Sequence, residues 1–267
     1  MTARLPTYFI SHGGGPWPWM KEQLGGAYDQ LEAALARMPA EIGATPRAVL
    51  MLSAHWEAPE FTVQTNAAPD MLYDYGGFPD FTYRIRYPAP GAPDVAARVR
   101  AALAAAGIAS AEDAQRGFDH GMFAPMAVIY PRADVPVLQL SLKRGLAPDA
   151  HLALGRALAP LRDEGILIVG SGLSYHNLRA FGPAARAPSA AFDAWLDETL
   201  AIADAATRSA ALAGWERAPA ARLAHPREEH LLPLMVAVGA AEGDAATRVY
   251  HEREFFGGIT VSSYRLG

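Results

Sequence analysis

Several apolar runs in this sequence end at or just before a histidine. Buried parallel strands have continuous apolar sequences, and open α/β sheets bind ligands in the crevice at the carboxyl ends of their strands. Three imidazoles at such ends could therefore face one pocket. His230, which follows Glu228 and Glu229, adds further nitrogen and oxygen donors, and our working hypothesis is a metal-dependent enzyme. The runs and their histidines are 8–11 with His12, 48–54 with His55, and 166–174 with His176.

Each histidine also has a plainer interpretation. One strand-end imidazole is more often structural than functional, but His12 and His55 at equivalent ends favour a site. His120 follows Asp119 in a loop before a predicted helix at 122–129, and Asp119 could either orient the imidazole or cap that helix. His176 lies in a Gly- and Ser-rich segment, where support of a ligand from behind or an acid/base role is as plausible as metal ligation.

The segment 225–234 has the sequence pattern of a helix start. Pro226 suits the first helical position, and Glu228 and Glu229 suit a first turn because the helix dipole favours negative charge there. A basic imidazole in a first turn is disfavoured unless it is neutral and bound, so His230 calls for a functional explanation. We expect His151, in the first turn of a predicted helix, and His251, in a polar stretch, to be structural.

The pattern of apolar runs predicts how these residues are positioned. A helix at 189–204 with Ser189 as its N-cap, and another opening at Asp149, lie between predicted strands. Alternating strands and helices predict an α/β fold, a single domain over 1–267 with a mainly parallel central sheet flanked by helices. The predicted strands are 7–11, 48–54, 135–141, 166–171 and 259–264.

Two segments do not fit this alternation. Residues 66–91 are rich in Pro, Gly and aromatic side chains, and could form a lid or pocket wall, or a loop that packs its aromatics on the domain surface. The Ala-rich residues 205–222 favour a variable helix and connection over a domain boundary.

Composition excludes several classes of function. The 267 residues are 51% hydrophobic, which is ample for a large core, and the formal net charge of −5 without a long Lys/Arg run argues against nucleic-acid binding. With no cysteine, disulfides, thiolate nucleophiles and cysteine-held metals are ruled out, so a metal must sit on His, Asp, Glu or water. Residues 1–4 run into a strand-like segment without a legible signal peptide or membrane span. We expect a soluble cytoplasmic protein, with homo-oligomerisation open.

Short motifs along the chain resemble the class III extradiol ring-cleavage dioxygenases, in the LigB-like branch that includes 4,5-DOPA dioxygenases. They occur in the family's order over nearly the whole chain, and the ordered set is specific although each motif alone is weak. The matching pieces are Ser11-His12-Gly13-Gly14, Ser53-Ala54-His55-Trp56, Gly76-Gly77-Phe78-Pro79, Tyr87-Pro88-Ala89-Pro90-Gly91, Gly117-Phe118-Asp119-His120-Gly121, 136–141, Gly170-Ser171-Gly172 with His176-Asn177-Leu178, and 229–234.

The resemblance implies a metal site in a cleft at strand ends, with His12, His55 and His230 as ligands. It implies that His176 is a fourth ligand or the catalytic acid/base. His120 matches a histidine that contacts substrate or dioxygen. Some related dioxygenases complete the iron site with a carboxylate, so Glu229 is the alternative to His230.

The implied reaction is insertion of O2 into a small catechol, DOPA-like or other, to give a muconic semialdehyde, with no nucleic-acid or membrane partner. Fe(II) is the implied working metal, although an all-imidazole donor set also binds Zn(II) readily. Five aromatic residues are candidates to stack on the substrate ring: Trp17, Trp56, Tyr75, Phe78 and Tyr175.

Two other functions are compatible with the same residues. A zinc hydrolase would use a metal-bound water, with Glu229 as its general base. A non-enzymatic binding protein could keep this fold without turnover, although a complete set of His12, His55, His120, His176 and His230 weighs against a lost active site.

Overall fold

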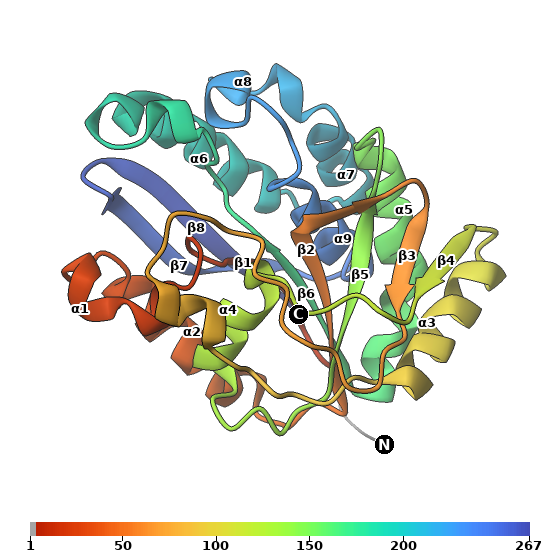
Figure 1. The fold of residues 1–267 in the computed structure, drawn as a ribbon. Coiled ribbons are helices and arrows are strands. Elements are labelled where there is room, and N and C mark those ends of the chain that lie inside the picture. The colour runs from red at the N-terminus through yellow and green to blue at the C-terminus, as the bar shows by residue number, and fades with distance from the viewer. Residues whose placement is uncertain (1–3) are drawn as a thin grey trace.

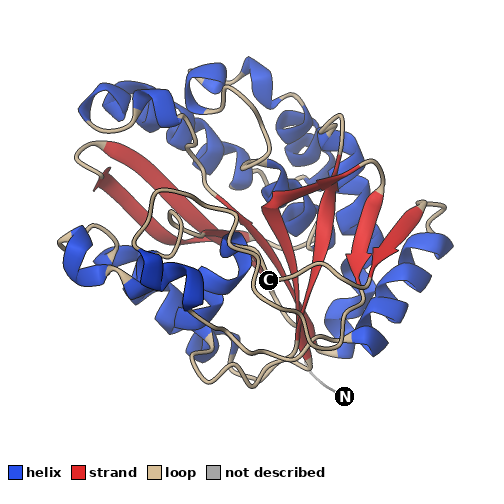
Figure 2. Ribbon diagram, in the orientation of Figure 1, coloured by secondary structure: helices blue, strands red, loops and turns tan. Residues whose placement is uncertain are grey.

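Residues 4–267 contain an eight-stranded sheet with helices on both of its faces (Figures 1 and 2). The computed structural model describes residues 4–267; residues 1–3, the first part of the N-terminal segment in which we expect no leader, lie outside the described residues. The strand order is β4-β3-β5-β2-β6-β1-β8-β7. The strands are β1 (Thr7–Ser11), β2 (Ala48–Ala58), β3 (Phe61–Gln64), β4 (Ser110–Asp113), β5 (Val137–Lys143), β6 (Ile166–Gly172), β7 (Ala246–Phe255) and β8 (Ile259–Leu266).

The centre of the sheet is parallel, as the sequence predicts. The pairs β1/β6, β6/β2 and β2/β5 are parallel, and so is the edge pair β3/β4. Antiparallel pairs join β3 to β5, β1 to β8, and β8 to β7. All five predicted strands exist, and the α/β class with a mainly parallel sheet is confirmed. The prediction did not include β3, β4 or β7.

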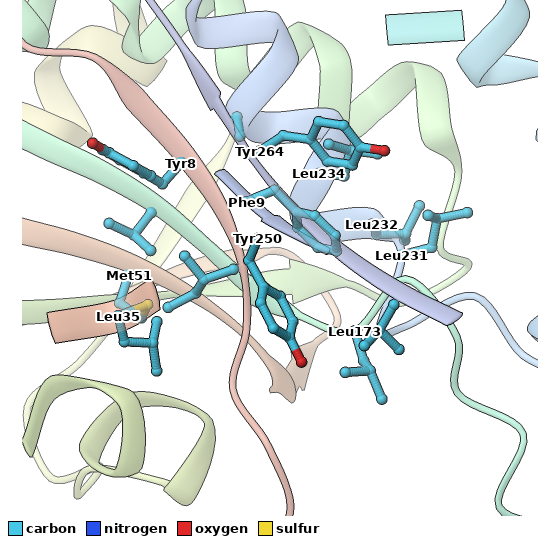
Figure 3. Close-up of a cluster of buried hydrophobic side chains, with 14 of the residues drawn as sticks. Tyr8, Phe9, Leu35, Met51, Leu173, Leu231, Leu232, Leu234, Tyr250 and Tyr264 are labelled. Atoms are coloured by element: carbon cyan, nitrogen blue, oxygen red, sulfur yellow. The ribbon is translucent and has the colours of Figure 1, made fainter. Parts of the chain in front are cut away.

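Helices cover both faces because the central strands are apolar on both sides. Along β2, Val49 and Met51 pack into one buried cluster while Leu50 and Leu52 pack into another on the opposite face. Figure 3 shows part of the first cluster, around Tyr8 and Phe9. The helices are α1 (Lys21–Leu24), α2 (Asp29–Ile42), α3 (Pro93–Ala105), α4 (His120–Ile129), α5 (Pro148–Leu158), α6 (Arg186–Leu200), α7 (Ala205–Ala213), α8 (Ala221–Ala224) and α9 (Leu232–Ala240).

In the described part of the chain, six short 3₁₀ helices connect these elements, at Trp17–Trp19, Asp80–Arg84, Ala159–Glu164, Leu178–Ala180, Pro183–Ala185 and Trp215–Arg217. Within residues 4–267, no helix combines the length and apolar character needed to cross a membrane.

Two predicted helix starts are wrong. Helix α6 begins at Arg186, and Ser189 lies inside it, where its hydroxyl donates to the Arg186 carbonyl and accepts from the backbone N–H of Thr260. Residues 226–231 form turns, and α9 begins only at Leu232 with Pro233 in its first turn. The predicted starts of two other helices, α4 and α5, were nearly correct. Asp119 caps α4 by accepting from the N–H of Met122, and α5 begins at Pro148, one residue before the predicted Asp149.

The segment 66–91 contains one 3₁₀ helix and otherwise irregular backbone. Its aromatic side chains pack on one another, with the Tyr75 ring centroid 5.3 Å from that of Phe78 and 5.4 Å from that of Tyr83. The hydroxyls of Tyr73 and Tyr75 donate to the carbonyls of Ile85 and Thr82. The Ala-rich segment 205–222 forms α7 and then short turns, as expected of a helix and connection.

His151 is a buried structural histidine in α5. Its Nδ1 is 2.8 Å from the Ala147 carbonyl oxygen, and its Nε2 accepts from the backbone N–H of Lys143. Burial lowers the pKa of His151 from 6.5 to about 4. The imidazole is therefore neutral in the folded protein at neutral pH.

We expect His151 to make the protein less stable in mild acid. Between about pH 6.5 and pH 4 the unfolded chain carries a proton here that the folded chain does not, so the free energy of unfolding falls as the pH drops, by about 3 kcal/mol once both forms are protonated. Denaturant titrations from pH 4 to 7 measure this. His151→Gln should reduce the number of protons taken up on unfolding by about one, and so flatten the slope of the unfolding free energy against pH. An unchanged slope would contradict this role of His151.

Candidate metal centre

The histidines of interest meet at the carboxyl ends of the central strands. His12 directly follows β1, His55 lies within β2 where its pairing with β5 is interrupted, and His176 comes four residues after β6. His230 precedes α9 and is 3% exposed. His120 is the first residue of α4. Five separate parts of the fold thus deliver one imidazole each to the same place.

Three of these imidazoles surround a common point. The ring centroids of His12 and His55 are 4.9 Å apart, those of His12 and His230 are 5.2 Å apart, and those of His55 and His230 are 5.0 Å apart. The Nε2 atoms of His12 and His55 are 3.1 Å apart. The convergence that the sequence suggested is therefore present.

The other two imidazoles lie against different members of this group. The His120 ring centroid is 4.0 Å from that of His55. The His176 ring stacks on His230, with centroids 3.3 Å apart and planes 15° from parallel. By distance between donor atoms, the cluster forms two sets that could hold a cation: His12, His55 and His120, and His176, Glu229 and His230.

Hydrogen bonds determine the tautomer of His12. The Ser171 hydroxyl has one proton, which it donates to the Gly121 carbonyl oxygen. It must therefore accept from the Nδ1 of His12, 3.1 Å away, which places the imidazole proton on Nδ1. The lone pair of His12 is then on Nε2, the atom that faces His55. This lone pair can accept a hydrogen bond from Nε2–H of His55, 3.1 Å away, or bind a cation that replaces that proton.

Carboxylates orient the other imidazoles in the same way. Glu229 Oε1 accepts from Nδ1 of His230 at 2.9 Å, and Nε2 of His230 is buried without a hydrogen-bond partner among the described residues. Asp74 Oδ1 is 2.8 Å from Nδ1 of His120, and Asp74 Oδ2 is 3.4 Å from Nδ1 of His55. Imidazoles held at Nδ1 by an acceptor, with Nε2 free, are characteristic of metal ligands. The donor set therefore fits a divalent metal.

The electrostatics of the cluster keep these lone pairs available. Burial first, and then the neighbouring imidazoles, hold the pKa of His12 well below its usual range. Burial and His120 lower the pKa of His55 to about 4. Burial alone would raise the pKa of Glu229, but hydrogen bonds from His176 and His230 outweigh it and hold that pKa far below its usual range. Neutral imidazoles beside an ionised carboxylate suit a cation.

Small residues in β6 let the His230 segment reach the site. A Cβ on Gly170 would lie 2.3 Å from the Pro233 carbonyl oxygen, and one on Gly172 would lie 2.1 Å from the His230 carbonyl oxygen. That carbonyl accepts from the N–H of Leu173. The backbone before α9 is therefore seated directly on the end of β6, and only glycine permits this approach.

The ring-stacking candidates do not line the central cavity, which has a volume of about 200 Å³. Trp17 is fully buried, and its Nε1–H donates to the His12 carbonyl oxygen at 2.8 Å. Trp56 lies under the guanidinium of Arg116, and Tyr175 is 1% exposed. The cavity-lining residues within 4–267 are His12, Gly13, Gly14, Gly15, Tyr28, His55, His120, Leu173, His176, Leu178, Phe181, His230 and Phe255.

Two further candidates lie close to the cavity without lining it. The Phe78 ring would be 2.7 Å from a Cβ on Gly15, so it packs behind the glycine turn. The Tyr75 ring centroid is 5.9 Å from that of His120. Phe78 and Tyr75 therefore support the wall of the cavity from outside.

Sequence reasoning missed the groups that hold the imidazoles in place. Asp74 lies in the aromatic segment and Ser171 in a strand, and neither has a sequence signature of its own. Asp119 was considered only as a cap or an orienting group for His120. In the structure it also accepts from the hydroxyl of Ser53, 2.7 Å away, and from Arg116, so it braces the β2 backbone that carries His55.

The sheet and its donor set define an α/β protein with a histidine-rich metal centre, and the comparisons with known proteins agree. Residues 6–267 match the family model described as LigB, the catalytic subunit of aromatic ring-opening dioxygenase. The chain therefore belongs to the LigB family of aromatic ring-opening dioxygenases, whose members use a non-heme metal.

Curated relatives and a solved structure support this assignment. A 4,5-DOPA dioxygenase extradiol of Beta vulgaris is 40% identical over 226 residues, 83% of each chain. The protein of that name from Escherichia coli K12 is 32% identical over 271 residues, covering 100% of this chain and 96% of the relative. The dioxygenase tasH of Hapsidospora irregularis is 36% identical over 98% of this chain and 85% of its own. An uncharacterized Escherichia coli K12 protein of known crystal structure has a TM-score of 0.79 at 28% identity, covering 99% of this chain and 100% of that one.

Replacing Ser171 by Ala should weaken metal binding. Without the hydroxyl, nothing fixes the His12 proton on Nδ1, and loss of such a partner typically costs 10- to 100-fold in metal affinity. Chelator competition with Zn(II) measures the change. Ser141→Ala is the matched control, since Ser141 is also a fully buried strand serine, and it bonds to Thr62 and Glu60 instead. Equal affinities for the two variants would contradict this role of Ser171.

Proposed function

We propose that the protein is an extradiol dioxygenase that inserts O2 into a small catechol at an Fe(II) ion and releases a muconic semialdehyde. The observation that carries the proposal is the meeting of His12, His55 and His230, each with Nδ1 facing an oxygen acceptor. The family supports the type of reaction, since its relatives are named as dioxygenases.

In this proposal His12, His55 and His230 hold the metal through Nε2. Fe(II) would supply a centre at which the catechol oxygens and O2 can be brought together and electrons can pass from the ring to oxygen. Zn(II) can occupy the same nitrogens without this redox chemistry. Glu229, the alternative ligand, already accepts from His230 and lies 3.3 Å from Nδ1 of His176, so we assign it the role of orienting both rings.

His176 is our candidate for the acid and base. It is partly exposed at the cavity, and its Nδ1 faces Glu229, which leaves Nε2 to exchange a proton with a catechol hydroxyl. An imidazole is suited to accepting this proton and returning it later near neutral pH.

His120 is our candidate for the group that binds the oxygen side of the reaction. Asp74 accepts one hydrogen bond from Nδ1 of His120 and a second from the backbone N–H of His120, so this residue is held at two points. Its Nε2 remains available for a hydrogen bond in the cavity. Burial alone would raise the pKa of Asp74, but the hydrogen bond from His120 and the neighbouring imidazoles outweigh it and lower that pKa, so Asp74 stays an ionised acceptor for the ring.

A zinc hydrolase would require Glu229 to act as a general base. Its carboxylate is already engaged by the two imidazoles, and Arg227 lies 3.4 Å from Oε2. Its pKa is held far below its usual range, against the opposing effect of burial. A weakly basic, fully engaged carboxylate is a poor proton acceptor, and this favours the dioxygenase over the hydrolase.

Anaerobic reconstitution tests the proposal. The metal-free protein is loaded with Fe(II) or with Zn(II), mixed with catechols and then exposed to air, while O2 uptake and the absorbance of a yellow ring-opened product are followed. We expect one O2 consumed per catechol with Fe(II) and none with Zn(II). Catechol binding without O2 uptake under Fe(II) would support a binding protein and refute the dioxygenase.

His176→Gln and His120→Gln should each lower turnover by about 10²- to 10⁴-fold, the range expected for a true acid/base group. His251→Gln is the matched control, since His251 lies on β7 and bonds to Ser262, away from the cavity. Iron content is measured on every variant. A variant that loses iron together with activity would identify the residue as a ligand, and one that keeps full activity would remove its catalytic role.

A further inference from the structure

Beyond the five imidazoles, the cavity wall is apolar. Three glycines, Gly13 to Gly15, form one part of it, and the remaining side chains are Tyr28, Leu173, Leu178, Phe181 and Phe255. Among the described residues that line the cavity, none is Asp, Glu, Lys or Arg. A charged substituent on a substrate ring would therefore find no side-chain counter-ion within the cavity wall.

The apolar wall continues outward to two exposed side chains, Leu178 and Phe256. Leu178, which lines the cavity, is 69% exposed. Phe256 is 36% exposed, and its ring centroid is 5.3 Å from that of Tyr28 and 5.4 Å from that of Phe181. We refer to Tyr28, Leu178, Phe181, Phe255 and Phe256 as the apolar rim.

The backbone at Phe256 supports a functional interpretation of the rim. Phe256 has a φ of +47° in the turn between β7 and β8, although two glycines that accept positive φ readily follow it. A bulky residue in this conformation is strained, and such strain concentrates at functional sites. Here it presents the phenyl ring against Tyr28 and Phe181.

Nearby charges are engaged elsewhere or lie outside the wall. Arg186 forms a double ion pair with Glu254, and Arg227 forms one with Glu57. Arg179, which follows Leu178, is exposed and is not part of the described lining. The cavity volume of about 200 Å³ equals that of about seven liquid water molecules, enough for one aromatic ring with a short chain.

We propose that the preferred substrates are catechols with an uncharged apolar substituent, which lies against the apolar rim, and not catechols with an amino-acid side chain such as DOPA. This inference rests on the proposed function and specifies its substrate class. Burying the carboxylate and ammonium of DOPA against this wall would cost free energy that no partner offsets, whereas each methylene placed there is stabilising.

Binding to the Zn(II)-loaded protein tests the proposal without turnover. Dissociation constants are measured by anaerobic calorimetry for catechol, 4-methylcatechol, 4-ethylcatechol, 4-propylcatechol and DOPA. We expect Kd to fall about fourfold for each added methylene, and DOPA to bind no more tightly than catechol. A flat alkyl series, or DOPA binding more tightly than 4-propylcatechol, would overturn the proposal.

A charge introduced at the rim provides a second test. Leu178→Arg should strengthen binding of 3-(3,4-dihydroxyphenyl)propionate relative to 4-propylcatechol by about tenfold, as expected when a carboxylate gains a cationic partner. Leu223→Arg is the matched control, since Leu223 is 60% exposed and does not line the cavity. Both substitutions are at exposed positions and should leave folding intact. An equal change in the two variants would overturn the assignment of the rim.

O2 uptake separates failure of this inference from failure of the proposed function. If the Fe(II) protein cleaves catechols but prefers DOPA in both kcat/KM and Kd, the dioxygenase stands and the apolar substrate class is wrong. If no catechol is cleaved under Fe(II), the dioxygenase is wrong, and the order of the dissociation constants still decides whether the rim binds apolar substituents.

Discussion

The structure depends on a cluster of imidazoles whose rings converge at the carboxyl ends of the central strands. The Nε2 atoms of His12 and His55 lie 3.1 Å apart, and Nε2 of His230 has no partner among the described residues. This arrangement suits a cation, and Ser171, Asp74 and Glu229 hold the rings in it from behind. The surrounding fold can be understood as the support for these three oxygen acceptors.

That support comes from the parallel strands and from the turn before α9. The parallel strands β1, β2 and β6 bring His12, His55 and the His176 segment to one edge of the sheet. Glycines in β6 then allow the turn before α9 to rest on the strand, which brings Glu229 and His230 to the same edge. Close backbone approach therefore does as much to build the site as the choice of ligands.

Much of this arrangement could be predicted from sequence, for identifiable reasons. The central strands are apolar on both faces, so their pattern is unambiguous, and β8 is also apolar. In contrast, β7 carries charged residues and β4 is a short polar edge strand, so neither has an apolar run. The helix start predicted at Pro226 failed because Glu229 pairs with two imidazoles instead of capping a helix. Whether an aromatic ring faces a cavity depends on packing, as Trp17 and Tyr175 illustrate.

Asp74 contributes one carboxylate to two imidazoles, His55 and His120, that come from different elements. It is carried by the irregular segment 66–91, whose aromatic side chains pack mainly on one another. Any displacement of that segment would withdraw a negative charge from both rings at once. The position of this loop and the charge beside both imidazoles are therefore coupled. Substrates of different size, by displacing the loop to different extents, would change that charge to different extents.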